Sequence, residues 1–474
     1  MQQQLPRRAN YVVSGFAKHG TGSKLIPRSN HSSQGNPNYR RRQEKMLSEL
    51  LSREWALLHP GTRIHKIMVS DTEGHSGASQ AANKFSFRNN TFPLLGDALI
   101  EETNSERCFF VVRDDLLHPF VNGNKARKLD AVIPLLDAHS VTDVVTCGGC
   151  QSAHTAAVDT DLQGYAHAAV SCAEKGVRPH LLLRGRQPEV STGYNLVSTM
   201  YGNVMYIPTS VYANREEMLS KNAEIIAGEN GCVLSLSDIV GASRGHDRAE
   251  SADGVPFSSR SLHNQHIAQG TCERSLRKVV VIKEGAGDVV ALLGLIRLVE
   301  YLSQPSLFGR AHKVEVIVDA GTGTTAIGLG LGMLLFGLHW EVTAVMLADT
   351  IEGYKRQEKH LITEFMRCYG GDTLPLSNNV TAAGIVNWVK RFSPRKFGNV
   401  LKGELEVCQQ IAQQTGVLVD PVYTLSAWEV AVDKCQMQSG GTALTLMLHT
   451  GGTLGMFGLA QRYKSYFNAM QHNS

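Results

Sequence analysis

Two short blocks constrain the fold and chemistry of this chain more than any other part of its sequence. The first, residues 121–129, is VNGNKARKL and places Lys125 at the start of a predicted helix. A helix N-terminus disfavours a charged lysine, and so favours the neutral amine that attacks carbonyl carbons. The second, residues 146–155, is TCGGCQSAHT and leads from a predicted strand through glycines into a helix. A lone Gly-Asn-Lys is more often a solvated turn, so the lysine site needs support from elsewhere.

That support comes from a candidate phosphate site. Residues 319–325 are DAGTGTT and join a predicted strand to a predicted helix. Inward-turned backbone N–H groups, threonine hydroxyls and the helix N-terminus together predict anion binding. The candidate ligands are Gly321, Thr322, Gly323, Thr324 and Thr325. A Rossmann dinucleotide loop is the alternative, but no acidic residue follows at a strand end about twenty residues later. A single phosphate is therefore favoured.

The hydrophobic pattern predicts an α/β fold with mostly parallel sheets, because β-rich runs alternate with helical periodicity from residue 108 onward. Predicted strands cover residues 108–112, 141–146, 180–184, 204–207, 278–282, 314–319, 341–346 and 443–449. Predicted helices cover residues 125–136, 170–175, 193–200, 215–227, 288–302, 324–336, 354–368, 404–415, 426–437 and 454–463.

The chain is long enough for two domains. We expect residues 75–129 and 277–474 to form a larger domain and residues 130–240 a smaller α/β domain. Residues 241–276 are polar and break the alternation, which predicts an insertion or linker. Residues 1–45 form a separate N-terminal segment.

The N-terminal segment has a distinctive charge pattern. Residues 1–43 hold eight basic residues and no acidic one, although the whole chain has a net charge of only +4. An Arg-rich, acid-free segment predicts an organelle transit peptide, mitochondrial before chloroplast, with a disordered basic tail as the alternative. The modest net charge predicts no nucleic-acid partner. The longest apolar run, residues 327–340, is interrupted by glycines and too short for a membrane span.

Nine scattered cysteines imply no disulfide framework, and most of them should be buried thiols. Cys147 and Cys150 have the spacing of a redox or zinc pair. Zinc would need a second ligand pair, and no other cysteines have suitable spacing, so no metal is expected.

The three blocks together resemble the pyridoxal-phosphate enzymes of the tryptophan synthase β fold. Within them the chain resembles the D-cysteine desulfhydrase and 1-aminocyclopropane-1-carboxylate deaminase family, and looks most like its plant mitochondrial members. The similarity runs from about residue 113 to residue 466. The motifs that carry it are RDDL at 113–116, GNKARKL at 123–129, GGCQS at 148–152, DPVY at 420–423 and HTGG at 449–452.

The resemblance implies a role for each matching residue. Lys125 matches the lysine that binds pyridoxal 5'-phosphate covalently, and residues 321–325 match the phosphate loop. Ser152 and Tyr423 match catalytic residues beside the substrate, and Thr450 is placed to hydrogen-bond the pyridine nitrogen and leave it largely unprotonated. The substrate would be a small D-amino acid, contacted by residues of the second block and by a threonine after DPVY. These predicted substrate contacts are Gln151, Ser152, His154, Thr155 and Thr424. The family resemblance also suggests a homodimer.

The chain departs from the family pattern in two places. The family has an asparagine where Ala153 stands, so Asn124 is the candidate for the hydrogen bond to the phenolic oxygen of the cofactor. Residues 159–168 interrupt the helix that follows the second block, and two carboxylates and a glycine there predict a bulged loop.

Three functions remain open at this point. The first is elimination of sulfide from D-cysteine, which gives pyruvate, hydrogen sulfide and ammonia. The second is ring-opening deamination of 1-aminocyclopropane-1-carboxylate; that type of site tends to carry Glu and Leu where this chain has Thr424 and Thr450. The third is a cofactor-binding protein that the 159–168 insertion has inactivated.

Overall fold

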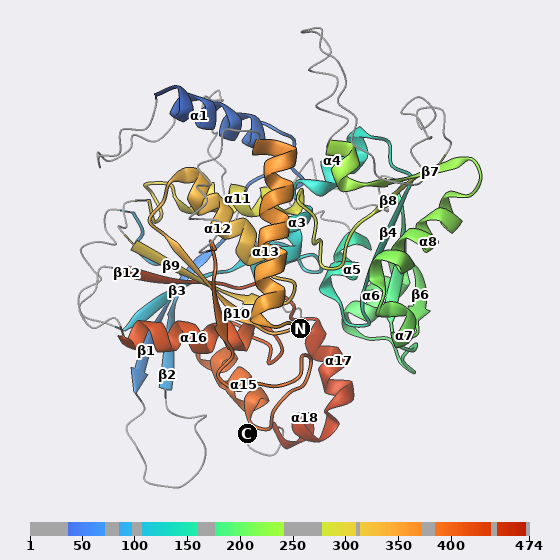
Figure 1. Ribbon diagram of the computed structural model, residues 1–474. Coiled ribbons are helices and arrows are strands. Elements are labelled where there is room, and N and C mark those ends of the chain that lie inside the picture. Colours follow the sequence, from blue (N-terminus) through green and yellow to red (C-terminus); the bar gives the residue numbers. More distant parts are fainter. Residues whose placement is uncertain are drawn as a thin grey trace, which may run out of the picture.

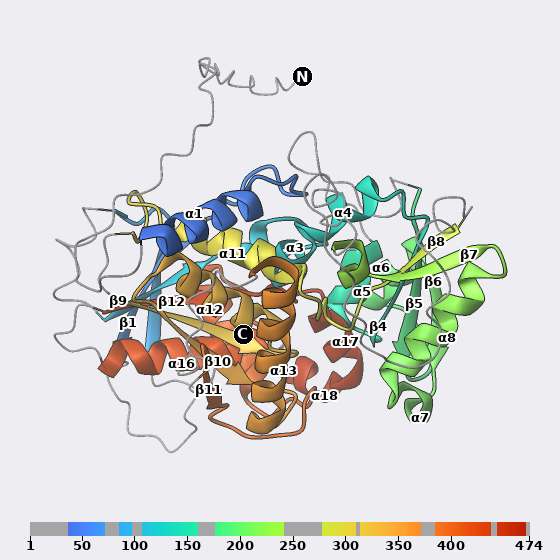
Figure 2. The same ribbon diagram turned by 45° about the horizontal axis from the view of Figure 1, so that its top comes forward.

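A computed structural model describes residues 37–71, 85–96, 107–159, 176–240, 277–309, 313–370, 384–437 and 443–470. These residues form two α/β domains that lie side by side, each built around its own sheet (Figures 1 and 2). The predicted α/β class is confirmed. Within the described ranges, no helix is both long enough and apolar enough to cross a membrane. The predicted helix at 170–175, the insertion from residue 160 to 168 and the polar segment 241–276 lie outside the described residues.

The larger domain contains a mixed sheet of seven strands, in the order β11-β10-β9-β12-β3-β1-β2. The pairs from β11 to β3 are parallel, whereas β1 is antiparallel to both β2 and β3. Its strands are β1 (Ile64–Asp71), β2 (Phe85–Asn90), β3 (Cys108–Val112), β9 (Lys313–Ala320), β10 (Glu341–Met346), β11 (Asn387–Lys390) and β12 (Ala443–Leu448).

The smaller domain contains a parallel sheet of five strands, in the order β6-β5-β4-β8-β7. Its strands are β4 (Asp143–Gly149), β5 (Arg178–Arg184), β6 (Asn203–Ile207), β7 (Gly231–Ser235) and β8 (Arg277–Val281). The helices around this sheet are α5 (Ala153–Asp159), α6 (Gly193–Tyr201), α7 (Thr209–Tyr212) and α8 (Arg215–Ala227).

The remaining helices pack on the larger sheet, on the connection between the domains or at the chain ends. They are α1 (Pro37–Leu51), α3 (Gly123–Leu129), α4 (Val132–Ala138), α11 (Ala291–Leu302), α12 (Thr324–Phe336), α13 (Ile351–Phe365), α15 (Glu404–Thr415), α16 (Thr424–Met437), α17 (Gly455–Arg462) and α18 (Lys464–Met470). Short helical turns lie at Asp114–Leu116 and Met366–Gly370.

Both faces of the larger sheet are buried, and β3 shows how its sequence achieves this. Successive side chains of a strand point to opposite faces. Phe110 and Val112 pack in the core that contains α11 and α12, whereas Phe109 and Val111 pack in the core that contains α16. On the second face Trp428 meets Phe109 edge to face, with ring centroids 5.0 Å apart. β3 is therefore a continuous apolar run, as expected for a strand of a sheet covered on both sides.

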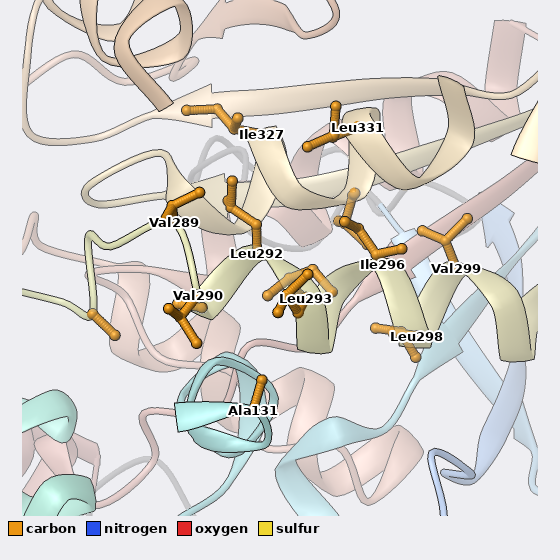
Figure 3. Close-up of a cluster of buried hydrophobic side chains, with 14 of the residues drawn as sticks. Ala131, Val289, Val290, Leu292, Leu293, Ile296, Leu298, Val299, Ile327 and Leu331 are labelled. Atoms are coloured by element: carbon orange, nitrogen blue, oxygen red, sulfur yellow. The ribbon is translucent and has the colours of Figure 1, made fainter. Parts of the chain in front are cut away.

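Glycines bring α3, α11 and α12 close together. Figure 3 shows the buried apolar side chains of this region. A Cβ atom added at Gly328 of α12 would lie 2.7 Å from the Cβ of Leu295 on α11. A Cβ at Gly294 of α11 would lie 1.8 Å from the carbonyl oxygen of Arg127 on α3. Only glycine allows these distances, so the glycines fix the position of α3 relative to α12. The helix with Lys125 and the helix that begins at the threonine loop are thereby parts of one rigid stack.

Several predicted elements differ from the structure. The predicted helix 125–136 is two helices, α3 and α4, because Asp130 between them bonds to distant partners. Its carboxylate accepts the N–H of Leu57 at 2.7 Å and pairs with Arg297 at 2.9 Å. β1, β2, β7 and β11 were not predicted from the sequence. Cys232 is disulfide-bonded, so it is not one of the free thiols.

Strand pairing crosses two of the predicted domain boundaries. β1 precedes residue 75 yet pairs with β2 and β3 in the larger sheet. β8 begins at Arg277, the residue expected to open the second part of the larger domain, yet it lies between β4 and β7 in the smaller sheet. In addition, α1 begins at Pro37, inside the predicted N-terminal segment, and Met46, Leu47 and Leu50 are buried in the main core.

A buried ion pair anchors α3 to the turn after β3. The guanidinium of Arg127 donates to both carboxylate oxygens of Asp114, at 2.9 and 2.7 Å, and both side chains are completely buried. We expect Arg127→Met to lower the free energy of unfolding by about 3–5 kcal/mol, because it leaves Asp114 as an unpaired buried charge. Urea denaturation would measure this loss.

Arg107→Met is the matched control for this prediction. Arg107 pairs with Asp71 at 2.7 Å, but the two side chains are 50% and 60% exposed. Loss of such an exposed pair should cost at most about 1 kcal/mol. Equal losses in the two variants would contradict the structural role of Arg127.

Candidate active site

Lys125 lies in the first turn of α3, and its amine is held by its neighbour. Its Nζ donates to Asn124 Oδ1 at 3.0 Å, and Asn124 Nδ2 donates to Thr325 Oγ1 at 3.0 Å. Burial lowers the pKa of Lys125 to about 8, and the charge of Asp319 opposes this shift. The neutral amine expected from the sequence is thus favoured, but the main cause is burial rather than the helix dipole. Asn124 links the amine to the threonine loop.

The threonine loop, residues 321–325, lies between β9 and α12. Gly323 caps α12 with a left-handed backbone, φ +82°, and a Cβ there would lie 3.1 Å from ring atoms of Trp388 and Tyr354. Thr322 Oγ1 and Thr324 Oγ1 are 3.2 Å apart. The backbone N–H groups at the start of a 13-residue helix and these hydroxyls suit an anion.

Two residues that the sequence analysis missed support this loop. The hydroxyl of Tyr354 on α13 lies 2.6 Å from the carbonyl oxygen of Ala320 and accepts the N–H of Ala348 at 3.0 Å. Its ring stacks on Trp388 with centroids 4.7 Å apart. Lys128 is buried and donates to the carbonyl oxygen of Gly285 at 2.9 Å. Tyr354 lies outside the motifs of the sequence, and Lys128 lies within GNKARKL, but the partner of each is in a distant segment that no local pattern identifies.

The DPVY block forms a turn around one carboxylate. Asp420 Oδ1 accepts the N–H groups of Val422 and Tyr423, both at 2.9 Å, and Asp420 Oδ2 accepts the hydroxyl of Thr424 at 2.9 Å. Burial first, and then the charges of Asp420 and Asp319, raise the pKa of Tyr423. Tyr423 is therefore a protonated hydrogen-bond donor at neutral pH. A Cβ at Gly321 would lie 3.5 Å from its ring, so Tyr423 lies beside the threonine loop.

Thr424 is placed differently from Tyr423. Its side chain is completely buried, its hydroxyl donates to Asp420, and its oxygen accepts the N–H of Asp420 at 2.8 Å. These two bonds hold the turn that presents Tyr423. A contact of Thr424 with substrate stays a prediction. The observed hydrogen bonds of Thr424 stabilise the turn that contains Asp420.

The second block lies between β4 and α5. Ser152 Oγ accepts the N–H of Thr155 at 3.4 Å, which leaves the hydroxyl hydrogen of Ser152 free to donate. Gln151 uses its amide for structure, because Nε2 donates to the carbonyl oxygen of Thr192 at 3.0 Å and Oε1 accepts the N–H of Tyr194 at 3.2 Å. Of these predicted substrate contacts, Ser152 keeps its hydroxyl donor, whereas both polar atoms of the Gln151 amide already bond to the backbone around α6.

His154 is buried and lies near the predicted anchor lysine. Its Nε2 and the carbonyl oxygen of Ile282 each lie 2.9 Å from the hydroxyl of Thr146, which donates its single hydrogen to Ile282. Burial, followed by the charges of Lys125 and Lys128, lowers the pKa of His154 well below its usual value. His154 is therefore neutral, which avoids a third positive charge beside the two lysines.

Thr450 and Asp319 meet at the ends of neighbouring strands. Thr450 Oγ1 donates to Asp319 Oδ1 at 2.5 Å, and both side chains are buried. Burial raises the pKa of Asp319 to about 6. The sequence analysis noted Asp319 only as the residue that begins its block.

Tyr194 is a further residue near this site that the sequence analysis missed. It is 1% exposed, and its hydroxyl has no hydrogen-bond partner with usual geometry among the described residues. Burial and the charge of Asp420 raise its pKa. Tyr194 comes from α6 of the smaller domain, so the smaller domain contributes a phenol beside Asp420 and Tyr423.

The surroundings of Cys147 and Cys150 disfavour redox chemistry and metal binding. Both thiols are free, and burial raises the pKa of Cys147 to about 12 and also raises that of Cys150. A raised pKa disfavours the thiolate that redox chemistry and zinc binding require. Across the described ranges, no group of three His, Cys, Asp or Glu side chains could hold a metal ion.

The chain is similar to several known proteins, although no family model matches the sequence. The chain is 51% identical over 428 residues to a rice (Oryza sativa subsp. japonica) protein named "Putative D-cysteine desulfhydrase 2, mitochondrial", covering 90% of this chain and 96% of that protein. It is 25% identical to an Arabidopsis thaliana protein named "Bifunctional D-cysteine desulfhydrase/1-aminocyclopropane-1-carboxylate deaminase, mitochondrial", covering 73% of each.

A solved structure also shares the fold. The crystal structure of a homologue of 1-aminocyclopropane-1-carboxylate deaminase superposes with a TM-score of 0.57 at 19% identity, covering 89% of this chain and 99% of that chain. This likeness confirms the two-domain fold of the tryptophan synthase β type. The rice relative shows that the chain belongs to the D-cysteine desulfhydrase and 1-aminocyclopropane-1-carboxylate deaminase family.

Proposed function

We propose that this chain is a pyridoxal-phosphate-dependent lyase that converts D-cysteine and water to pyruvate, hydrogen sulfide and ammonia. The observation that carries the proposal is the buried amine of Lys125, which Asn124 links to the threonine loop. Family membership and the name of the rice relative support the substrate.

The residues present fit this cofactor. The loop at 321–325 would hold its phosphate, Lys125 would bind it covalently, and Thr450 would face the nitrogen of its ring. The side chain of Asn124 bonds to both the Lys125 amine and Thr325, so the amine and the phosphate loop belong to one site. When bound, the cofactor supplies an electron-accepting ring that makes the α-proton of an amino acid acidic.

Three side chains of the protein would transfer protons and hold the substrate. Lys125, with its pKa near 8, has a substantial neutral fraction at physiological pH and can remove the α-proton. Tyr423 stays protonated and can donate a proton to the departing sulfur. Ser152 can donate its hydroxyl hydrogen to the substrate carboxylate. The released 2-aminoacrylate then hydrolyses in water to pyruvate and ammonia.

The first test of this function is Lys125→Ala. We expect loss of the visible absorbance of bound cofactor, loss of the borohydride-reducible link, and a fall in hydrogen sulfide release of roughly 10³-fold or more. Lys128→Met is the control, because Lys128 bonds to the carbonyl oxygen of Gly285 and should leave the reducible link in place. A reducible link in Lys125→Ala would show that another lysine is the anchor.

The second test is the choice between substrates. With the α-proton facing Lys125 and the carboxylate held near Ser152, only one enantiomer can react, and we expect it to be D. D-cysteine should exceed both L-cysteine and 1-aminocyclopropane-1-carboxylate by at least tenfold in kcat/KM, about 1.4 kcal/mol. Assays of hydrogen sulfide, pyruvate and ammonia would measure this. Faster turnover of L-cysteine or of the cyclopropane would overturn the assignment, and cofactor binding without any turnover would favour a passive binder.

We also propose that the protein is mitochondrial and homodimeric, with a transit peptide that ends before the buried part of α1. The acid-free composition and the mitochondrial names of two relatives support the address. A fluorescent reporter fused after residues 1–45 should enter mitochondria, and the same fusion with Arg7, Arg8 and Arg28 changed to glutamine should not. A diffuse or chloroplast signal from the unchanged fusion would contradict this prediction. Light scattering of the purified protein would test the dimer.

A further inference from the structure

Asp319 is a buried carboxylate at the centre of the larger domain. It is the second-last residue of β9, which lies between β10 and β12, and its side chain is 3% exposed. The charged or titratable groups that act on it are Lys125 from α3, Asp420 from the turn before α16 and His449 after β12. Thr450 also follows β12 and is its hydrogen-bond donor.

The bond between Thr450 and Asp319 fixes the direction of the threonine hydroxyl. An ionised carboxylate has no proton and can only accept, so the single hydroxyl hydrogen of Thr450 points at Asp319. The pKa of Asp319, raised by burial to about 6, still leaves it ionised at pH 7.5 and above. The free side of Thr450 Oγ1 then presents only lone pairs. Thr450 can accept a hydrogen bond from a ligand but cannot donate one.

The backbone around Thr450 holds this geometry in place. Its carbonyl oxygen accepts the N–H of Asn124 at 3.2 Å, and Gly123 packs against the same carbonyl with no room for a Cβ. Gly451, at φ +78°, packs in turn against Asn122. These contacts fix the backbone of Thr450 and so keep its Oγ1 within hydrogen-bond distance of Asp319.

We propose that Asp319 is a positioning residue that orients the Thr450 hydroxyl so that the site binds the protonated form of the cofactor's ring nitrogen. This rests on the proposed function, which places that nitrogen against Thr450. It replaces the expectation from the sequence that a neutral hydroxyl leaves the nitrogen largely unprotonated. Aspartate is a common direct partner of a protonated pyridine nitrogen; here the carboxylate acts through a hydroxyl. A protonated ring attracts electrons from Cα more strongly, which suits elimination.

The test is the nitrogen NMR spectrum of the holoenzyme loaded with cofactor that carries ¹⁵N at the ring nitrogen. At pH 8 the wild-type resonance should have the shift of a protonated ring, and Asp319→Asn should move it to the unprotonated position. An unprotonated ring in the wild-type protein would overturn the proposal without any variant. A protonated ring that persists in Asp319→Asn would also overturn it.

We call the chain of hydrogen bonds from Asp319 through Thr450 to the ring nitrogen the relay. Three further variants distinguish loss of this relay from a general loss of structure. Thr450→Ser keeps the hydroxyl and should keep the protonated shift, whereas Thr450→Val removes the hydroxyl and should lose it. Asp143→Asn removes a buried carboxylate of the smaller sheet, which Arg277 binds at 3.0 Å, and should leave the resonance unchanged. A protonated shift in Thr450→Val, or a lost one in Asp143→Asn, would contradict the relay. Borohydride reduction reports separately on Lys125, so a missing covalent link would reject the proposed function rather than this inference.

Discussion

The contact between Gly123 and the carbonyl group of Thr450 determines how the rest of the site is assembled. Gly123 has φ +62°, and a Cβ atom there would lie 1.9 Å from the oxygen of Thr450. A side chain at residue 123 would push the start of α3 away from the end of β12. Because glycine allows the approach, the chain before Lys125 lies directly against the residue that bonds to Asp319.

The helix packing behind this contact gives the site its rigidity. Gly294, Gly328 and Gly332 let α11 lie close to both α3 and α12, as Figure 3 shows for the surrounding apolar side chains. Lys125 and the threonine loop therefore begin two helices of one packed stack. Reactive groups on packed helices are held more firmly than groups on free loops, which favours accurate placement of a cofactor between them. The Arg127 and Asp114 pair adds a second, electrostatic anchor for α3.

Asp319 connects this architecture to the chemistry. Its charge opposes the effect of burial on the pKa of Lys125, and it adds to the effect of burial and Asp420 on the pKa of Tyr423. It also receives the hydroxyl of Thr450. One carboxylate therefore acts on the proposed base, the proposed proton donor and the proposed partner of the cofactor ring, so its substitution should alter several properties of the site together.

Local patterns in the sequence predicted most of the helices and strands. They predicted the ends of an element best where residues at those ends, such as glycines, mark them. The predicted helices 215–227, 324–336 and 404–415 and the strand 341–346 have the bounds seen in α8, α12, α15 and β10. Glycines in left-handed conformations end α12 and α15. Lys125, Ser152 and Tyr423 could be named as candidates because they lie in contiguous motifs, and their catalytic roles stay predictions.

Tertiary structure decided what depends on residues far apart in the chain. Three of the four missed strands, β2, β7 and β11, are sheet edges whose pairing gives only a weak local pattern. The break after α3 arises from Arg297, which is 167 residues from Asp130. Asp319 and Thr450 are separated by 131 residues and meet only because β9 and β12 are neighbours in the sheet. The sequence by itself therefore determined the candidate residues that lie in contiguous motifs. Only the fold added Tyr194 and Asp319 to the site and decided which way the Thr450 hydroxyl points, because that direction depends on a partner that strand pairing brings close.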